Sequence, residues 1–138
     1  MMRRVENWQK PFNEFFAERE KRPFEWGKND CALFAADCVR AITGEDLAEK
    51  WRGRYRTSRG ALRRMKKKGV TLEALADAEF FRVPVSMAQR GDVVMHHHDG
   101  PFGGALGVVG PGGVQACFAG ADGIDLRPVK SCMIAWRV

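Results

Sequence analysis

A cysteine stands where an apolar helix is predicted to begin. Asn29 or Asp30 is a suitable N-cap, and Gly44 is a typical helix end. The apolar residues between them recur at spacings of three and four: Leu33, Phe34, Cys38 and Ile42. Cys31 therefore falls in the first helical turn, where free amide N–H groups and the helix dipole favour a thiolate. This position suits a candidate nucleophile, and a small apolar residue at a helix start is the simpler alternative.

Three consecutive histidines are the other residues whose chemistry suits a cysteine. Neighbouring side chains in a strand point to opposite faces, so His96 and His98 could share the inner face and supply a candidate base. They stand just before Asp99-Gly100-Pro101, so an exposed turn is the interpretation we prefer. A metal site formed by His96, His98 and Asp99 is disfavoured, because contiguous ligands rarely close a tetrahedral site.

Length and composition predict one ordinary domain. The 138 residues carry a net charge of +6 and contain four cysteines. No apolar run approaches the length that spans a membrane, and the N-terminus resembles no signal peptide, so we expect synthesis in the bacterial cytoplasm. The cysteine spacings match no zinc or redox motif, which predicts free thiols, with Cys38 and Cys117 buried. We expect no metal and no cofactor.

The positive charge is concentrated in residues 50–68, which contain ten basic residues and no acidic one. Like charges on neighbouring helical positions destabilise a helix unless a partner relieves them. Nucleic-acid phosphate, an anionic cell-wall polymer and an acidic protein face would each do so. Trp51 and Tyr55 are the interleaved aromatic residues, and no nucleic-acid-binding motif is present. We therefore favour a protein partner and disfavour nucleic acid.

Helical patterns precede strand patterns along the chain. A helix from Cys31 to Gly44 is accompanied by predicted helical segments at 3–20, 46–51, 59–68 and 72–76. Short β-like runs separated by Gly- and Pro-rich turns follow at 91–95, 105–109, 114–118 and 133–138. The order predicts a single α+β domain, with a helical part at about 3–80 and a β-meander at about 83–138. The antiparallel sheet should pack on the helix that begins at Cys31.

Two motifs in this order resemble the NlpC-type cell-wall peptidases. They are Asn29-Asp30-Cys31 at a helix start and Arg90-Gly91-Asp92-Val93-Val94 at the start of a sheet. The resemblance runs from about residue 24 to the C-terminus and implies a papain-like fold that cuts peptidoglycan stems. A group of phage and prophage proteins associated with tail-tip gene clusters is more similar still. It shares Trp26-Gly27 and the runs Thr43-Gly44-Glu45-Asp46, Arg52-Gly53-Arg54-Tyr55 and Ala135-Trp136-Arg137-Val138.

The catalytic base of these peptidases has no counterpart at the matching position. In the family a histidine begins the strand that here reads Ala105-Leu106-Gly107-Val108, so alanine replaces the base. The residue that orients the base is polar and lies on the next strand, where Gln115 is the candidate. A thiol nucleophile needs a base within hydrogen-bond reach. The resemblance and this departure together imply a tail-tip component, in the baseplate or hub, whose degenerate peptidase fold serves assembly.

Two alternatives stay open. One is an active cysteine peptidase that degrades peptidoglycan during phage entry, with Cys31 as nucleophile and His96 or His98 as a relocated base. The other is a basic nucleic-acid-binding protein, which depends on residues 50–68 alone. The favoured interpretation implies other tail-tip proteins as partners, contacted through residues 50–68, possible contact with peptidoglycan, and a place in the virion tail.

Overall fold

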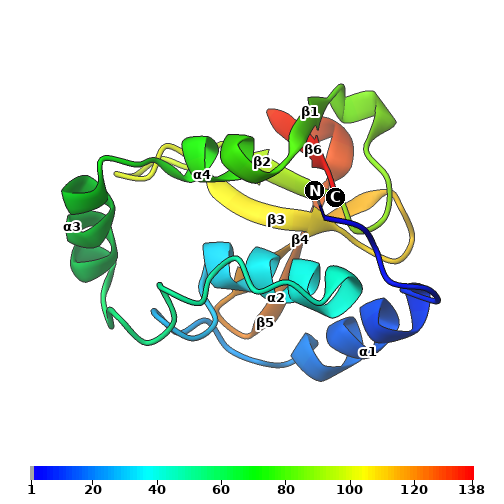
Figure 1. The fold of residues 1–138 in the computed structure, drawn as a ribbon, viewed down its shortest axis with the longest axis horizontal. Coiled ribbons are helices and arrows are strands. Elements are labelled where there is room, and N and C mark those ends of the chain that lie inside the picture. The colour runs from blue at the N-terminus through cyan, green and yellow to red at the C-terminus, as the bar shows by residue number, and fades with distance from the viewer. Residues whose placement is uncertain (1) are drawn as a thin grey trace.

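The fold is α+β, as the sequence predicts. The computed structural model describes residues 2–138. Within them, four helices, α1 to α4, span Gln9–Arg19, Cys31–Thr43, Ser58–Lys68 and Leu72–Glu79. Six strands, β1 to β6, span Phe81–Val83, Val93–His96, Ala105–Val109, Gln115–Gly120, Gly123–Pro128 and Ile134–Arg137. The sheet, α2 and α1 form successive layers (Figure 1).

The described strands form one antiparallel sheet with the order β1-β6-β2-β3-β4-β5. From β2 to β5 each strand pairs with the next, which is the predicted meander. The last strand departs from it, because β6 inserts between β1 and β2, with Ala135 opposite both Val83 and Val94. The simple meander predicted for 83–138 is therefore corrected at the end of the sheet that β1 and β6 form.

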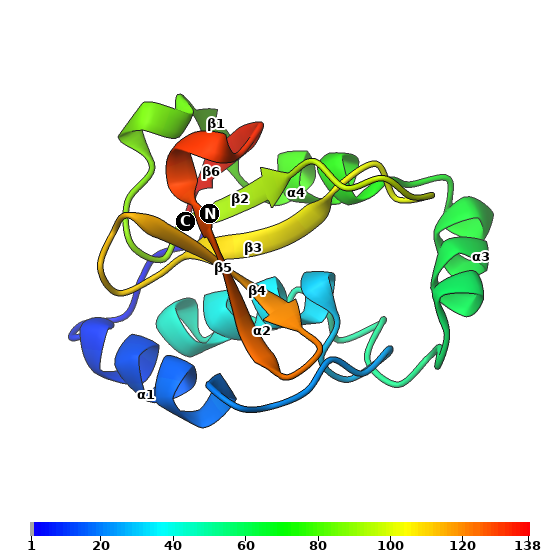
Figure 2. The same cartoon turned by 180° about the vertical axis from the view of Figure 1, so that it is seen from behind.

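Helix α2 is the element on which the sheet packs. The Asp30 side chain caps its start, and Gly44 ends it in the left-handed conformation, with φ 82°. The buried side of α2 lies against β3 and β4, and α1 covers its other side through Phe12, Phe15 and Phe16 (Figure 2). The prediction that Cys31 lies in the first turn of a helix packed on an antiparallel sheet is confirmed.

Side chains of β2 and β3 alternate between two apolar clusters on opposite faces of the sheet. The larger cluster includes α2 and receives Val93, Met95, Leu106 and Val108. The smaller cluster contains Val94, Val109, Ala116, Phe118 and Ala135, and Ala105 packs against it. Two short 3₁₀ segments, Val85–Met87 and Val129–Ser131, contribute Val85 and Val129 to this second face. The alternation decides which residues of β2 and β3 meet Cys31.

Several elements differ from those predicted. Residues 46–51 form turns and not a helix, because the Asp46 carboxylate accepts hydrogen bonds from the Ala48 N–H and the Arg52 guanidinium. The first helix begins at Gln9 and not near residue 3. Strand β5 gave no apolar signal, because most of its side chains are exposed at the edge of the sheet.

The predicted burial of Cys38 and Cys117 is confirmed. All four cysteines are free thiols, and burial raises the pKa of each one. Among the helices described for residues 2–138, none has the length and apolar character needed to cross a membrane.

Candidate functional site

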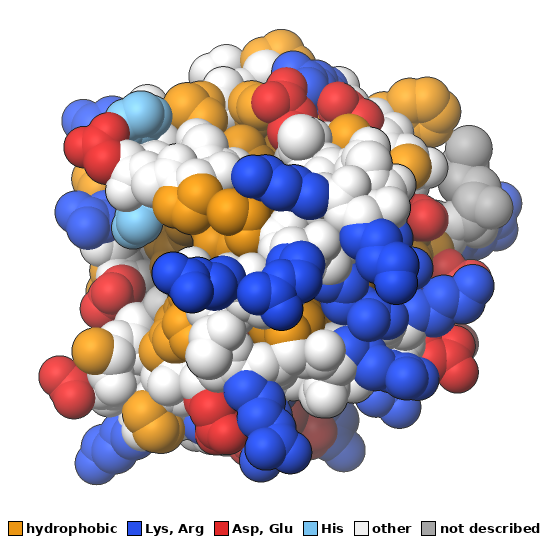
Figure 3. All heavy atoms as spheres, turned by 90° about the vertical axis from the view of Figure 1, so that its left-hand side faces the viewer, with side chains coloured by type: hydrophobic (Ala, Val, Ile, Leu, Met, Phe, Trp, Pro, Cys, Tyr) orange, Lys and Arg blue, Asp and Glu red, His pale blue; other side chains and the backbone are white. Residues whose placement is uncertain are grey.

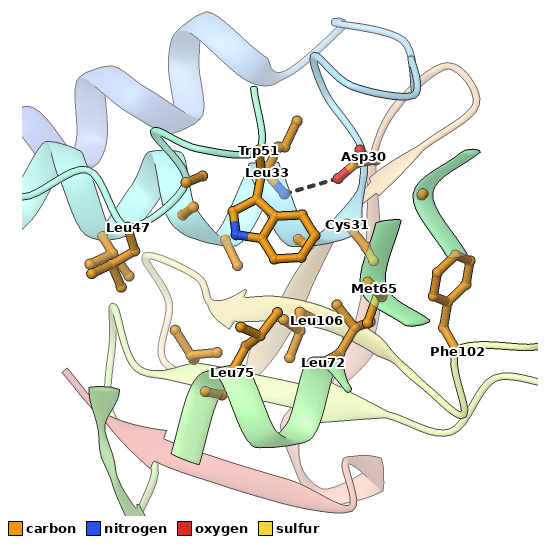
Figure 4. A pocket seen from close by; sticks show the side chains of 18 of the residues that line it. Asp30, Cys31, Leu33, Leu47, Trp51, Met65, Leu72, Leu75, Phe102 and Leu106 are labelled. Carbon is orange, nitrogen blue, oxygen red and sulfur yellow. Dashed lines mark hydrogen bonds between the residues drawn. The ribbon is translucent and has the colours of Figure 1, made fainter. Parts of the chain in front are cut away.

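Asp30 fixes the start of α2 and thereby the position of Cys31. Its buried carboxylate accepts hydrogen bonds from the Leu33 N–H at 3.0 Å and from the Gly27 N–H at 3.0 Å. A third bond comes from the Tyr55 hydroxyl at 2.6 Å. The bond to Leu33 is an N-cap, and the other two hold neighbouring loops against the helix start. Cys31 is consequently the first residue of α2, with its side chain directed inward (Figure 4).

The loop before α2 and the segment that carries Tyr55 are locked together. Gly27 has φ 80°, and a Cβ there would lie 2.0 Å from the carbonyl oxygen of Tyr55, so glycine is required. The Gly53 N–H donates to the Gly27 carbonyl at 2.9 Å. The Trp-Gly-x-x-Asp-Cys and Arg-Gly-Arg-Tyr motifs are therefore one structural unit, although Asp30 and Tyr55 stand 25 positions apart.

Arg52 connects this unit to the Thr43–Asp46 motif and to α2. Its guanidinium donates to the Asp46 carboxylate at 2.9 and 3.0 Å and pairs with Asp37 of α2. Asp37 also pairs with Arg19, the buried arginine of α1. The hydrogen bond from Arg52 lowers the pKa of Asp46, so the pair stays ionised. Arg52 and Asp46 thus support the site structurally.

The environment of Cys31 favours the thiol. Burial, together with a smaller contribution from the neighbouring Asp30 carboxylate, raises the pKa of Cys31 to about 11. The Leu106 N–H and the N–H groups of the first helical turn act in the opposite direction but do not offset burial. The sequence-based expectation that the helix start favours a thiolate is therefore wrong, because it considered the dipole and not the desolvation.

Leu106, and not Ala105, is the β3 residue that faces Cys31. Leu106 lines the same cavity as Cys31, its backbone acts on the pKa of the thiol, and its side chain lies in the core cluster that includes α2. Ala105 packs on the opposite face of the sheet. The alanine that stands at the position of the family's base thus faces away from Cys31, and the β3 residue beside the sulfur is a leucine.

The three histidines do not converge on Cys31. His96 pairs with Ala105 across β2 and β3, and its ring meets Phe118 edge-on at 6.1 Å between centroids, on the face away from α2. His97 and His98 are exposed, and His97 Nε2 is hydrogen-bonded to Asp99 Oδ1 at 2.9 Å. The shared inner face expected for His96 and His98 does not form, whereas the exposed turn is present.

Gln115 lies far along the sheet from Cys31. It is exposed at the start of β4, where its carbonyl accepts the Gly110 N–H at 2.9 Å. Gly110 directly follows the last residue of β3, whereas Cys31 meets β3 near its first residue. The candidate orienting residue is therefore placed at the other end of the strand.

The Cys31 sulfur faces an apolar cavity of about 180 Å³ between α2, α3, α4 and β3 (Figure 4). Its walls include Leu33, Met65, Leu72, Leu75 and Leu106. Trp26 and Phe102 stack with ring centroids 5.8 Å apart beside it, and Trp51 lines another part. Among the described residues that line this cavity, none is a histidine. The thiol therefore faces mainly hydrocarbon, with no imidazole among these lining residues.

Residues 3–138 match the family model described as Domain of unknown function (DUF6950). The chain belongs to this family. No curated protein matches the chain. The DUF6950 domain thus covers the whole unit described above, from α1 to β6, including Cys31 and the cavity.

The DUF6950 domain presents a basic surface over α3. Figure 3 shows Lys and Arg side chains gathered on this face, with apolar atoms between them. Of the ten basic residues of the segment 50–68, all are exposed except two. Arg52 is held by Asp46 and Asp37, and Arg64 lies over the ring of Trp51. The predicted basic surface is therefore formed by the remaining eight.

In residues 2–138, no group of three or more His, Cys, Asp or Glu side chains is placed to hold a metal ion. The site residue that the sequence did not reveal is Tyr55, the one tyrosine of the chain. Its motif was recognisable, but its bond to Asp30 requires the loop 44–57 to fold back on the start of α2. The sequence also did not indicate that Leu106 lies beside Cys31, because the face on which its side chain lies depends on the register of β3.

Proposed function

We propose that this DUF6950 domain is a degenerate papain-like domain of the NlpC type, which serves as a structural component of a phage or prophage tail tip. The order of the parts supports the fold assignment: a cysteine at the first residue of a helix, packed on an antiparallel sheet whose third strand meets the sulfur. The tail-tip role is supported by the motifs shared with proteins of tail-tip gene clusters.

One observation carries the structural role: Leu106 occupies the place beside Cys31 where a peptidase needs an imidazole. A thiol with a pKa of about 11 is almost entirely protonated at neutral pH. Without a base it receives no help in losing that proton, and without a general acid the leaving amine receives none. The active peptidase with His96 or His98 as base is disfavoured, since His96 lies on the other face of the sheet.

The exposed basic residues of the segment 50–68 supply the contact surface in this proposal. Eight cations without acidic neighbours in the segment are suited to an acidic face on another tail-tip protein. The nucleic-acid alternative has the same charge to support it but no aromatic platform, because Trp51 and Tyr55 are both half-buried in the domain.

The test is complementation of a phage or prophage that encodes this chain and from which the gene has been deleted. Cys31→Ala should restore infectious tails to the wild-type level, because the proposal assigns no chemistry to the thiol. Reversal of the exposed cations Arg59, Arg63 and Lys67 to Glu should restore fewer, with the domain still folded, since exposed substitutions cost under about 0.5 kcal/mol each.

Arg3, Lys10 and Lys21, three exposed cations outside α3 reversed together, are the matched control. A Cys31→Ala variant as defective as the deletion would contradict the structural role. Normal tail assembly with the α3 charge-reversal variant would show that the basic segment is a solvated surface and not a contact surface.

A further inference from the structure

The cavity beside Cys31 is large for the interior of a domain of this size. Protein interiors hold few voids larger than a water molecule. This one measures about 180 Å³, and an engineered apolar cavity of about 150 Å³ stays dry and binds benzene. Its wall formed by α3 is thin, because α3 buries only Ala61 and Met65, both against the cavity. The space therefore admits one compact apolar group, and it is too small for a full lipid tail.

The interior of the cavity offers little to a polar ligand. The Asp30 carboxylate already accepts three hydrogen bonds, and the Tyr55 hydroxyl is used by one of them. Glu79 lines the cavity as an exposed residue at its rim. The remaining polar groups among the described lining residues are the Cys31 thiol, a weak hydrogen-bond former, and the indole N–H groups of Trp26 and Trp51, which can only donate. A group that enters the cavity must therefore be apolar.

Two cations stand next to the cavity at Trp51. The Arg64 guanidinium lies 5.9 Å from the centroid of the Trp51 ring, and the Lys68 ammonium lies 5.5 Å from it. The Arg64 Nε is buried and is the one buried side-chain nitrogen or oxygen in residues 2–138 that lacks a hydrogen-bond partner. An unsatisfied buried donor is costly, and a carboxylate or similar anion would satisfy it.

We propose that the cavity binds a small anionic amphiphile, whose compact apolar part fills the space beside Cys31 and whose anionic end lies at Trp51 between Arg64 and Lys68. The inference rests on the proposed function in one respect: the ligand is held and not hydrolysed. It assigns the cavity a binding role that needs neither a base nor a thiolate.

The full chain should be titrated with hexanoate, hexan-1-ol and hexylammonium, which share one apolar chain and differ in their charge, and binding followed by amide NMR shifts. Hexanoate should bind with a Kd on the order of 1 mM, as its few atoms allow. Hexanol should bind about threefold to tenfold more weakly, and hexylammonium more weakly again. Equal binding of hexanoate and hexylammonium, or binding of none of the three, would overturn the proposal.

Variants locate the site. Ala76→Leu places extra atoms into the cavity from α4 and should abolish the shifts, whereas Ala74→Leu on the exposed side of α4 should leave them unchanged. Lys68→Gln, which alters an exposed residue, should weaken hexanoate about threefold and leave hexanol unaffected. An unchanged hexanoate Kd in Lys68→Gln would contradict the placement of the ligand's anionic end beside Lys68. This test stands even if Ala76→Leu fails to fold.

Cys31→Ala should bind hexanoate as the wild type does, because neither proposal uses the thiol. Two other outcomes separate the two proposals. Peptidoglycan hydrolysis by the wild type would contradict the proposed function and leave the hexanoate result standing. Absence of hexanoate binding would contradict the proposed amphiphile site and leave the proposed structural role standing.

Discussion

Cys31 lies where a helix dipole would stabilise a thiolate, yet its neighbours favour the protonated form. The buried Asp30 carboxylate stands one residue away, and hydrocarbon from Leu106 and Met65 surrounds the sulfur. Desolvation outweighs the dipole here, because a first-turn dipole contributes about 0.3–1 kcal/mol, whereas burial shifts the pKa of an ionisable group by up to several units.

The alkylation rate of Cys31 tests this balance. The rate constant with iodoacetamide should rise with pH toward an inflection near pH 11, because the thiolate is the reacting species. Folding stability should fall as the pH rises from about 9 toward 11, since the folded state retains a proton that the unfolded chain releases. Tandem mass spectrometry can separate Cys31 from Cys38 in the same peptide. An inflection below pH 9 would mean an activated cysteine.

Tyr55 is the residue that holds the two loops of the site together through Asp30. Tyr55→Phe removes the 2.6 Å hydrogen bond to a buried carboxylate and should lower the free energy of unfolding by about 1.5–3 kcal/mol. Urea denaturation measures this, with Phe102→Leu as a comparison at a half-buried aromatic residue without a carboxylate partner in this structure. A change below about 0.5 kcal/mol for Tyr55→Phe would show that Asp30 does not depend on it.

At the scale of elements, Asp92 joins the start of β2 to both ends of the chain. Its fully buried carboxylate accepts bonds from Arg4 at 3.1 Å, Arg137 at 2.9 Å, the Gln89 N–H at 2.9 Å and the Val138 N–H at 3.0 Å. The Arg-Gly-Asp run, which suggested a peptidase strand, therefore has a structural use here: it closes the sheet around the chain ends.

Asp92→Asn should destabilise the domain by about 3–5 kcal/mol, because it leaves two arginines beside a neutral group and mismatches an N–H donor. Thermal unfolding monitored by circular dichroism measures the loss. The exposed Asp122→Asn is the control and should change stability by less than about 0.5 kcal/mol. Similar melting temperatures for both variants would refute the structural use of Asp92.

Elements with a strong local signal were predictable from the sequence. The cap at Asp30, the apolar face of α2 and the glycine at position 44 are local features, and so is the run Ala105–Val109, which forms β3 with the predicted bounds. Strand β5 escaped notice because its side chains face solvent, and the turns at 46–51 depend on Arg52 reaching Asp46. The site was predictable as a position, Cys31, but its facing partner Leu106 follows from strand register, which the sequence does not state.

At the scale of the whole molecule, the fold that we propose resembles that of a cysteine peptidase, but the surroundings of the cysteine do not suit catalysis. A cysteine begins a helix that packs on an antiparallel sheet, as in the proposed papain-like fold, whereas the side chains that line the cavity beside the sulfur are mostly apolar and the histidines lie elsewhere. The exposed cations of the segment 50–68 are gathered over α3, beside the cavity (Figure 3). The charged surface beside an apolar site is the combination on which the proposed contact role rests.

Muropeptide release from purified peptidoglycan tests the central claim most directly. The wild type, Cys31→Ala, His96→Ala and His98→Ala should be compared at equal concentration. The account predicts four equal, background-level rates, because loss of a positioned acid–base group forfeits about 10²–10⁴ in rate and the thiol is protonated. A wild-type rate clearly above that of Cys31→Ala would contradict the account, and the histidine variant that abolished the excess would identify the base.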